Sequence, residues 1–276
     1  MKCLVINLDR SRNRLAHVTA EFSRIGVQFE RVAAVDMLER PDLSQRATGR
    51  MSGVELACLL SHRACWAIIA AGDDSHGAVF EDDVVLSAEA ARLLGDAAWI
   101  PGDADVVKIE TFLSKVSLKR ERIPCGNGFS TSRLLSAHIG AAGYILSKQA
   151  ARDLFDATED IDVPVDQLLF NPLFQTSSSK VIYQLTPALC VQDRFISEKD
   201  ARLESLLSAD RRRRSAATRA SRKGMRYAVA KATTETRRLV RQFVNLWQLR
   251  QRRIIPFERG DSRSDPPHTQ LFEDAL

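Results

Sequence analysis

Short apolar segments with the length of buried strands alternate with amphipathic helical segments along the first 195 residues of this 276-residue chain. The pattern opens with a predicted strand at residues 2–8, a helix that ends at Gly26, and a second strand over residues 27–35. A strand, a helix and a strand in succession favour a parallel sheet with helices packed on its faces. The sequence therefore predicts a Rossmann-like α/β fold.

The remaining elements follow from the same periodicity and from turn signals. A helix begins at Ser52, where Ser52 and Glu55 have the spacing of a capping box, and it ends near Ala71. The other predicted elements are strands at 77–81, 105–109, 139–146 and 181–185, helices at 87–95, 147–157 and 164–170, and a less regular β insertion or loop at 112–136.

Beyond about residue 200 the strand pattern stops and the charge changes sign. Residues 1–200 hold 22 Lys and Arg against 27 Asp and Glu, whereas residues 201–260 hold 17 against 4. We therefore expect two parts, an α/β domain over residues 1–198 and a basic α-helical tail over residues 199–276.

Residues 211–253 of this tail combine many arginines with scattered apolar residues, including Phe243 and Trp247. Such a segment can lie at the surface of an anionic membrane, where each nearby Lys or Arg contributes roughly 1 kcal/mol. The alternative is a solvated, partly disordered tail. We expect no nucleic-acid partner, because no nucleic-acid-binding motif occurs and the first 200 residues are acidic.

Cysteine usage and the N-terminus both indicate a cytoplasmic protein. The five cysteines are widely spaced, without a C-x-x-C pair that would suggest zinc or redox chemistry. The apolar run at the N-terminus is too short for a signal peptide, and no apolar run approaches the roughly 20 residues of a membrane span. If the tail binds lipid, the chain would act as a peripheral protein on the inner membrane face.

Three consecutive carboxylates, Glu81, Asp82 and Asp83, directly follow the strand predicted at 77–81. In open α/β sheets ligands bind beyond the carboxyl ends of the strands. Adjacent carboxylates repel one another unless a cation or hydrogen-bond donors compensate them. Mn²⁺ and Mg²⁺ prefer carboxylate and phosphate oxygens, so the triplet predicts a metal site that also holds a nucleotide diphosphate. The alternative is a solvated acidic turn.

The order of motifs over residues 1–195 resembles glycosyltransferase family 25. The blocks that carry the resemblance are Val5-Ile6-Asn7-Leu8-Asp9-Arg10-x-x-x-Arg14, Gly53-Val54-Glu55-Leu56-Ala57-Cys58-Leu59-Leu60-Ser61-His62, Glu81-Asp82-Asp83, Gly140-x-x-Gly143-Tyr144-x-x-Ser147 and Pro164-Val165-Asp166. The resemblance implies a GT-A-like nucleotide-sugar-binding domain with a mixed central sheet. It also implies a metal-dependent, inverting transfer of a hexose, galactose from UDP-galactose, to a saccharide of lipopolysaccharide or lipooligosaccharide, lipid-linked or free.

The resemblance assigns roles to residues at the strand ends. Glu81, Asp82 and Asp83 would hold Mn²⁺ or Mg²⁺ and the diphosphate of the UDP-sugar, with Asp82 as the ambiguous member. Four polar residues that follow the first strand would bind uridine or phosphate: Asn7, Asp9, Arg10 and Arg14. A solvated helix face is the alternative for the two arginines.

Two further blocks are candidates for binding the donor or acceptor. Ser61 and His62 lie on a largely apolar helix, where a histidine is more often a hydrogen-bonded structural residue, but the resemblance implies a position beside the active site. We do not expect His62 to bind metal, because no second histidine stands at ligand spacing. Gly143 would let backbone approach a ligand and Tyr144 would stack on a sugar ring; a tightly packed strand is the alternative.

Inverting transfer to an alcohol needs a carboxylate that removes the hydroxyl proton. Asp166 is the candidate general base, and a residue that complements the helix dipole is the alternative. Glu110, after the strand at 105–109, competes for the role, as do Asp160 and Asp162. A different class of function, a non-catalytic binding or adhesion protein that keeps the fold, also remains open.

Overall fold

The computed structural model describes residues 1–47, 51–158, 163–196 and 250–260. The helices of these segments are α1 (Arg12–Arg24), α2 (Asp42–Arg46), α3 (Gly53–Ala71), α4 (Ala90–Gly95), α5 (Lys148–Ala157), α6 (Val165–Phe170), α7 (Gln175–Ser178) and the 3₁₀ helix η1 (Asp193–Phe195). The strands are β1 (Lys2–Asn7), β2 (Glu30–Ala33), β3 (His76–Glu81), β4 (Val84–Leu86), β5 (Val106–Lys108), β6 (Glu110–Thr111), β7 (Lys115–Lys119), β8 (Ile123–Gly126), β9 (Phe129–Arg133), β10 (Gly143–Ser147), β11 (Ile182–Thr186), β12 (Cys190–Gln192) and β13 (Arg250–Ile254).

The central sheet is mixed, which confirms the predicted fold class. Its described strands follow the order β2-β1-β3-β10-β5-β11-β9-β8. β1 pairs in parallel with β2 and β3, and β5 pairs in parallel with β11, whereas β10 runs antiparallel between β3 and β5. β1, β3 and β5 therefore all end at the same edge of the sheet, where ligands of α/β folds bind.

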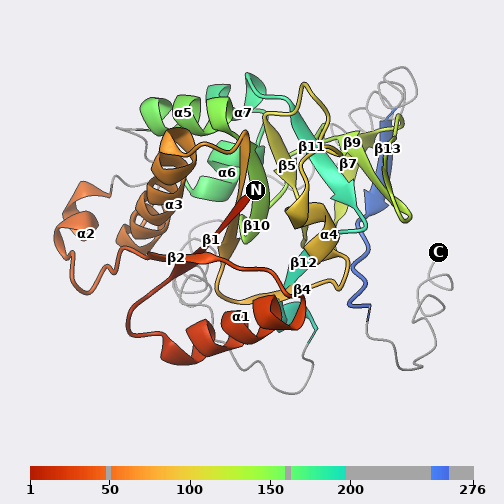
Figure 1. The fold of residues 1–276 in the computed structure, drawn as a ribbon. Coiled ribbons are helices and arrows are strands. Elements are labelled where there is room, and N and C mark those ends of the chain that lie inside the picture. The colour runs from red at the N-terminus through yellow and green to blue at the C-terminus, as the bar shows by residue number, and fades with distance from the viewer. Residues whose placement is uncertain (48–50, 159–162, 197–249, 261–276) are drawn as a thin grey trace, which may run out of the picture.

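Helices cover both faces of this sheet (Figure 1). Because side chains alternate along a strand, Leu4 and Ile6 of β1 pack in a core with α3, α5 and α6, while Cys3 and Val5 pack in a second core with α1 and α4. Each core contains a fully buried aromatic anchor, Trp66 of α3 in the first and Phe22 of α1 in the second.

α3 is the long helix that positions much of the candidate site. The predicted capping box at its start is confirmed, since Glu55 N–H donates to Ser52 Oγ and Ser52 N–H donates to the Glu55 carboxylate. By length and composition α3 could cross a membrane, but here it is a core helix packed on the sheet. A Cβ added to Gly77 would lie 2.5 Å from Ile69 Cγ1, so this glycine lets β3 and α3 approach closely.

Several predicted boundaries differ from the structure. The second strand is shorter than residues 27–35. The strand predicted at 139–146 begins only at Gly143, because Gly140 adopts a positive φ of 83° in the loop before it. The insertion at 112–136 contains β7, β8 and β9, so it is β structure.

The prediction of a wholly helical tail is wrong for residues 250–254. They form β13, which pairs antiparallel with β7, as Figure 1 shows. The chain then runs along the α/β domain: Thr111 Oγ1 donates to the carbonyl of Ile255 at 2.7 Å, and Ala88 N–H donates to that of Arg259 at 2.9 Å. Residues 250–260 therefore pack on the domain that the sequence placed at 1–198.

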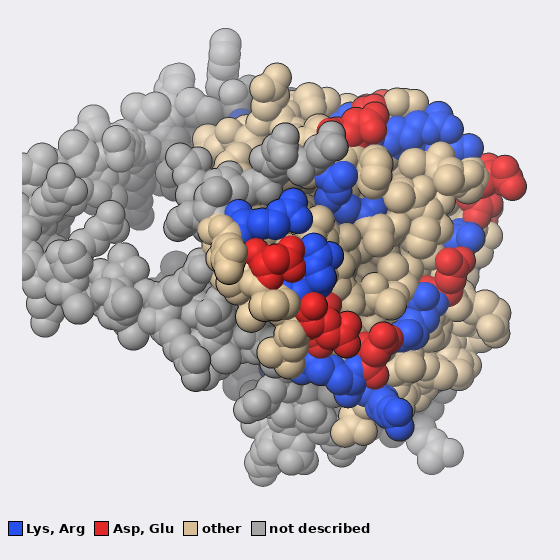
Figure 2. Space-filling view, turned by 90° about the vertical axis from the view of Figure 1, so that its left-hand side faces the viewer, with Lys and Arg blue, Asp and Glu red and all other residues tan. Residues whose placement is uncertain are grey.

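The strongly basic part of the predicted tail, including Arg211–Arg214, lies outside the described residues. On the face shown in Figure 2, Lys and Arg stand beside Asp and Glu without a continuous patch of one sign among the described residues. This mixture agrees with the sequence, in which the excess of positive charge belongs to residues 201–260.

Candidate active site

A pocket of about 360 Å³ opens at the carboxyl ends of β1 and β3. Its polar lining comes from five segments, namely the loop after β1, helix α1, the loop after β2, helix α3, and the end of β3 with the turn that follows it. These residues are Arg10, Arg14, Asp36, Cys58, Ser61, His62, Glu81, Asp82 and Asp83. The structure thus brings together the acidic triplet, both candidate arginines and the Ser61–His62 pair.

The acidic triplet is not a solvated turn. Asp82 and Asp83 are only 4% and 6% exposed. Arg14 of α1 reaches both, with Nε 3.1 Å from Asp82 Oδ1 and Nη2 2.6 Å from Asp83 Oδ2. Asn7, at the end of β1, donates from Nδ2 to Asp82 Oδ2 at 2.7 Å. Asp82 is therefore held on both oxygens by protein groups.

Asp83 is less well compensated than Asp82. Burial and the negative charge of Glu81 raise the pKa of Asp83 to about 7, against the opposing effect of Arg14. Its Oδ1 is buried and has no hydrogen-bond partner among the described residues. An unpaired buried carboxylate oxygen is costly unless a cation or donor approaches it.

Glu81 is the most exposed carboxylate of the triplet, with 22% of its side chain accessible. Burial would raise its pKa, but His62, Arg14 and Arg194 together hold the pKa of Glu81 below the ordinary value. Its Oε1 lies 3.5 Å from His62 Nε2, and Gln192 Nε2 lies 3.5 Å from its Oε2. Glu81 is thus ionised at the mouth of the pocket.

These donors fit a hard divalent cation. Glu81 and Asp83 both line the pocket, and Asp83 Oδ1 has no hydrogen-bond partner among the described residues. Mg²⁺ and Mn²⁺ commonly take one or two protein carboxylates and complete their shell with phosphate and water. Asp82 does not fit as well, because Asn7 and Arg14 already occupy its oxygens.

His62 lines the pocket, and its ring contacts groups on both sides. Its Nε2 faces Glu81, and its Nδ1 contacts a buried tyrosine. Nδ1 is 2.8 Å from Tyr144 Oη, and Trp66 Nε1 donates to the same oxygen at 2.9 Å. The prediction that Tyr144 stacks on a sugar ring is therefore wrong, since the tyrosine is fully buried and its hydroxyl orients His62. Gly143 is also a packing residue, because an added Cβ would lie 2.2 Å from Cys190 Sγ.

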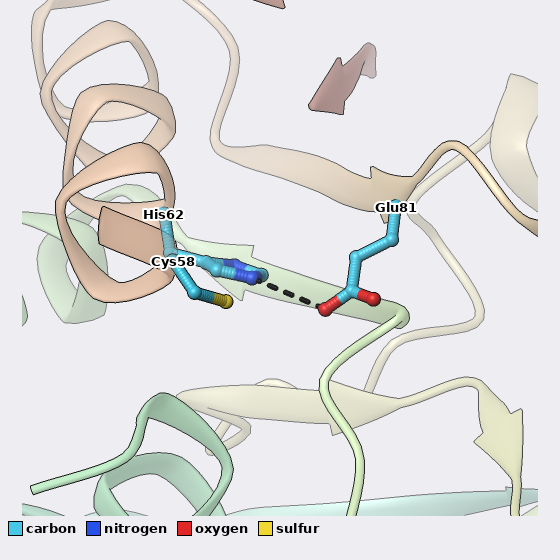
Figure 3. A group of neighbouring side chains, drawn as sticks. All are labelled: Cys58, His62 and Glu81. Atoms are coloured by element: carbon cyan, nitrogen blue, oxygen red, sulfur yellow. Dashed lines mark ion pairs between the residues drawn. The ribbon is translucent and has the colours of Figure 1, made fainter. Parts of the chain in front are cut away.

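His62 has two potential co-ligands that the sequence did not reveal as a group. Cys58 lies one turn earlier on α3, and Glu81 faces both side chains from the end of β3 (Figure 3). One ligand atom from each of the three lies within 4.8 Å of the others. No second histidine is needed for a metal-ligating set, because a thiol and a carboxylate complete it.

Of the other residues predicted for nucleotide binding, Arg10 and Ser61 line the pocket and Asp9 does not. Arg10 lines the pocket and pairs with Asp36, holding the pKa of Asp36 below its ordinary value. Asp9 is 72% exposed on its side chain, pairs with Arg31 and lies outside this pocket. Ser61 Oγ donates to the Ala57 carbonyl and accepts from Val35 N–H, so Ser61 fixes the pocket wall.

Glu110 and Asp166, the two candidate general bases that the structure describes, do not line the pocket. Glu110 has no exposed surface, pairs with Lys108 at 3.0 Å and accepts from Ala142 N–H at 3.1 Å. Because it is sealed in the core, the prediction that Glu110 acts as a base is wrong. Burial raises the pKa of Glu110, although Lys108 opposes this.

Asp166 is 5% exposed, and its Oδ2 accepts from Gly140 N–H at 3.2 Å. In this structure it anchors the loop before β10 rather than facing the pocket. The competing candidates Asp160 and Asp162 lie outside the described residues. Of Asp166, Glu110 and His62, only His62 lines the pocket.

The structure places three residues at the site that the sequence analysis did not predict, namely Asp36, Gln192 and Arg194. The last two belong to β12 and η1, more than 100 positions after the triplet, and Gln192 contacts Glu81. The exposed guanidinium of Arg194 lies 5.1 Å from the Phe112 ring centroid and lowers the pKa of Glu81. A short apolar run before Gln192 is the signal in the sequence that a strand brings them there.

An α/β domain whose acidic residues and pocket lie at the carboxyl ends of parallel strands is typical of nucleotide-binding enzymes. Residues 1–169 match the model of glycosyltransferase family 25 (LPS biosynthesis protein). The chain belongs to this family and is a glycosyltransferase, and its central sheet is mixed, as the resemblance implied.

Two named relatives from the sequence comparison agree with this assignment. The chain is 31% identical to the lacto-N-neotetraose biosynthesis glycosyltransferase LgtB of Neisseria meningitidis serogroup B, over 92% of this chain and 98% of that protein. It is 30% identical to the lipooligosaccharide biosynthesis protein lic2B of Haemophilus influenzae, over 76% and 82%. A solved glycosyltransferase involved in glycosylation of the major capsid of PBCV-1 has a TM-score of 0.38 and 10% identity, over 69% and 91%.

Proposed function

We propose that the chain is a metal-dependent, inverting glycosyltransferase that moves a hexose, galactose from UDP-galactose, to a saccharide hydroxyl of lipopolysaccharide or lipooligosaccharide. The acceptor class is supported by the names of relatives that are lipooligosaccharide biosynthesis proteins. The galactose donor and the inversion follow from the family resemblance alone.

One observation carries the donor-binding part of this proposal. Asp83 is a buried residue of the pocket lining with one carboxylate oxygen unpartnered among the described residues, and the ionised Glu81 lines the same pocket. A divalent cation held by Glu81 and Asp83 would neutralise the charge that grows on the departing diphosphate. The transfer then needs no protonated leaving group, which suits a nucleotide diphosphate.

The remaining pocket residues would bind the nucleotide. Val35, Met37, Leu38 and Val54 give the pocket an apolar side on which a uracil ring could pack. The guanidinium of Arg10 and the exposed Arg194 carry positive charge toward the place where a diphosphate would lie. Arg14, which already compensates Asp82 and Asp83, holds the acidic turn in place and does not need to touch the substrate.

A donor screen tests the proposal. UDP release from a panel of UDP-sugars is measured with Mn²⁺, with Mg²⁺ and after chelation, using a lipooligosaccharide acceptor. We expect the fastest metal-stimulated release from UDP-galactose, and loss of that release in Asp83→Ala with the fold retained by circular dichroism. Equal rates with and without a divalent cation would reject the metal assignment, and preference for another sugar would reject the donor.

We also propose that the enzyme works at the cytoplasmic face of the inner membrane, where a lipid-linked acceptor is accessible. The support is the composition of residues 211–253, most of which lie outside the described residues. Replacing Arg211–Arg214 by serine should weaken co-sedimentation with anionic phosphatidylglycerol vesicles, since each nearby Arg contributes about 1 kcal/mol. Unchanged co-sedimentation would contradict this role.

A further inference from the structure

We infer that Cys58, His62 and Glu81 form a binding site for a transition-metal ion of the zinc class, distinct in ligand chemistry from a hard-cation site at Glu81 and Asp83. Cys58 and His62 are four residues apart on α3 and therefore share a face of the helix. Glu81 meets them from β3, and the three ligand atoms lie within 4.8 Å of one another.

The donor set selects the class of metal. Thiolate, imidazole and carboxylate together are typical ligands of Zn²⁺, whereas Mg²⁺ and Mn²⁺ prefer oxygen alone. With metal–ligand bonds of about 2.0–2.3 Å, two ligands on a tetrahedral ion are roughly 3.3–3.8 Å apart. The ligand atoms of the cluster, which lie within 4.8 Å of one another, would have to approach by at most about 1–1.5 Å to reach this value.

A second observation points to a ligand at the same place. His62 has no exposed surface, yet its Nε2 is directed to Glu81 at 3.5 Å and makes no hydrogen bond among the described residues. Its Nδ1 faces Tyr144 Oη, whose two lone pairs can accept from both His62 and Trp66. A metal-bound histidine typically donates its other N–H to such an acceptor, which fixes the ring.

The cluster is accessible from solvent. Cys58, His62 and Glu81 all line the pocket at the carboxyl ends of β1 and β3, and Cys58 and Glu81 are half-buried. A metal ion could therefore enter through the pocket, bind three protein ligands and keep water in its fourth position. The thiol of Cys58 would release its proton to solvent on binding.

Glu81 would be a ligand both of the zinc-class ion and of the proposed hard cation, and this sharing has a consequence for catalysis. A zinc-class ion that binds Glu81 withdraws this carboxylate from the cation that would hold the diphosphate. Zn²⁺ should therefore inhibit Mn²⁺-dependent transfer in competition with Mn²⁺. This consequence rests on the proposed function, whereas the binding site itself does not.

Cobalt spectroscopy of the full-length chain tests the site without any substrate. Co²⁺ bound through a thiolate gives a sulfur-to-metal charge-transfer band in the near ultraviolet. We expect this band in the wild type and in the control Cys125→Ser, whose cysteine lies on β8. It should disappear in Cys58→Ser, and calorimetry should show Zn²⁺ affinity reduced at least tenfold in Cys58→Ser and in Glu81→Gln.

Absence of the band in folded wild type, or a band that survives Cys58→Ser, would overturn the inference. Circular dichroism establishes that each variant is folded, and Cys58→Ala serves if the serine variant does not fold. In the activity assay, Zn²⁺ inhibition should be at least tenfold weaker in Cys58→Ser than in the wild type, relative to each protein's own Mn²⁺ rate. A chain that binds Zn²⁺ as predicted but has no transferase activity would contradict the proposed function and leave the metal site intact.

Discussion

Replacing Asp83 by asparagine should stabilise the metal-free protein while it removes activity. The pKa of about 7 in the folded chain lies above the ordinary 3.8, so folding favours the protonated carboxyl. The folded state therefore binds more protons than the unfolded state between about pH 4 and 7, and wild-type stability falls as the pH rises through this window. The difference of about 3 pKa units corresponds to about 4 kcal/mol once Asp83 is ionised.

The pKa of about 7 already includes the attraction of Arg14, so we expect the asparagine to gain about 4 kcal/mol in the free energy of unfolding at pH 8, or roughly 8–16 °C in Tm. At pH 4 the two proteins should unfold at nearly the same temperature. Thermal unfolding in EDTA at both pH values measures this, with Asp9→Asn as a control at an exposed carboxylate. Adding Mn²⁺ should raise the Tm of the wild type only.

In the same experiment, kcat/KM of Asp83→Asn should fall at least about 100-fold, since the cation loses one of its two proposed ligands. A variant that is less stable than the wild type at pH 8 in EDTA would refute the reasoning. So would a Tm difference that does not change between pH 4 and pH 8, because it would arise from packing rather than from charge.

Three further substitutions test the roles of buried residues. Asp166→Asn keeps an oxygen for Gly140 N–H, so kcat/KM should stay within about tenfold; a loss of 10²–10⁴ would restore its role as general base. Tyr144→Phe leaves a buried indole N–H without its acceptor, and should cost about 1–3 kcal/mol of stability by urea unfolding; no loss would mean that another acceptor replaces the hydroxyl. Gly143→Ala places a Cβ 2.2 Å from Cys190 Sγ and should lower the free energy of unfolding by about 1–3 kcal/mol. Most of this loss should disappear when Gly143→Ala is made in a Cys190→Ala protein. An equal loss with cysteine and with alanine at position 190 would contradict the clash.

Local signals in the sequence were sufficient to predict much of the fold. The capping box at Ser52 is formed by residues three positions apart, so its geometry is set without the rest of the chain. The start of β10 depends instead on the loop before it, where Gly140 is held by Asp166 and by Lys108. Because these contacts join residues 26 and 32 positions apart, no local pattern could predict the late start of the strand.

In the candidate site, too, local features were predictable from the sequence and features set by distant contacts were not. The position of Glu81 and Asp83 was predictable, because a carboxylate after a buried strand must lie at the sheet edge. The burial of Glu110 was not, since Glu110 also follows a strand and its contact with Ala142 N–H, 32 positions along the chain, belongs to the tertiary packing that seals it in the core. The tail strand β13 was missed because its pairing partner β7 is more than 100 positions away.

The charge balance of the acidic turn supports the proposed divalent-ion site. Glu81, Asp82 and Asp83 carry three negative charges when ionised, and Arg14 is the guanidinium paired with two of them in the part of the chain that the structure describes. This pairing leaves a net charge of −2 in a buried site, which the raised pKa of Asp83 reflects by holding a proton near neutral pH. A divalent cation of charge +2 would neutralise the remainder and displace that proton. Arg14 therefore compensates only part of the negative charge of the turn, and the remaining charge supports the divalent-ion site proposed above.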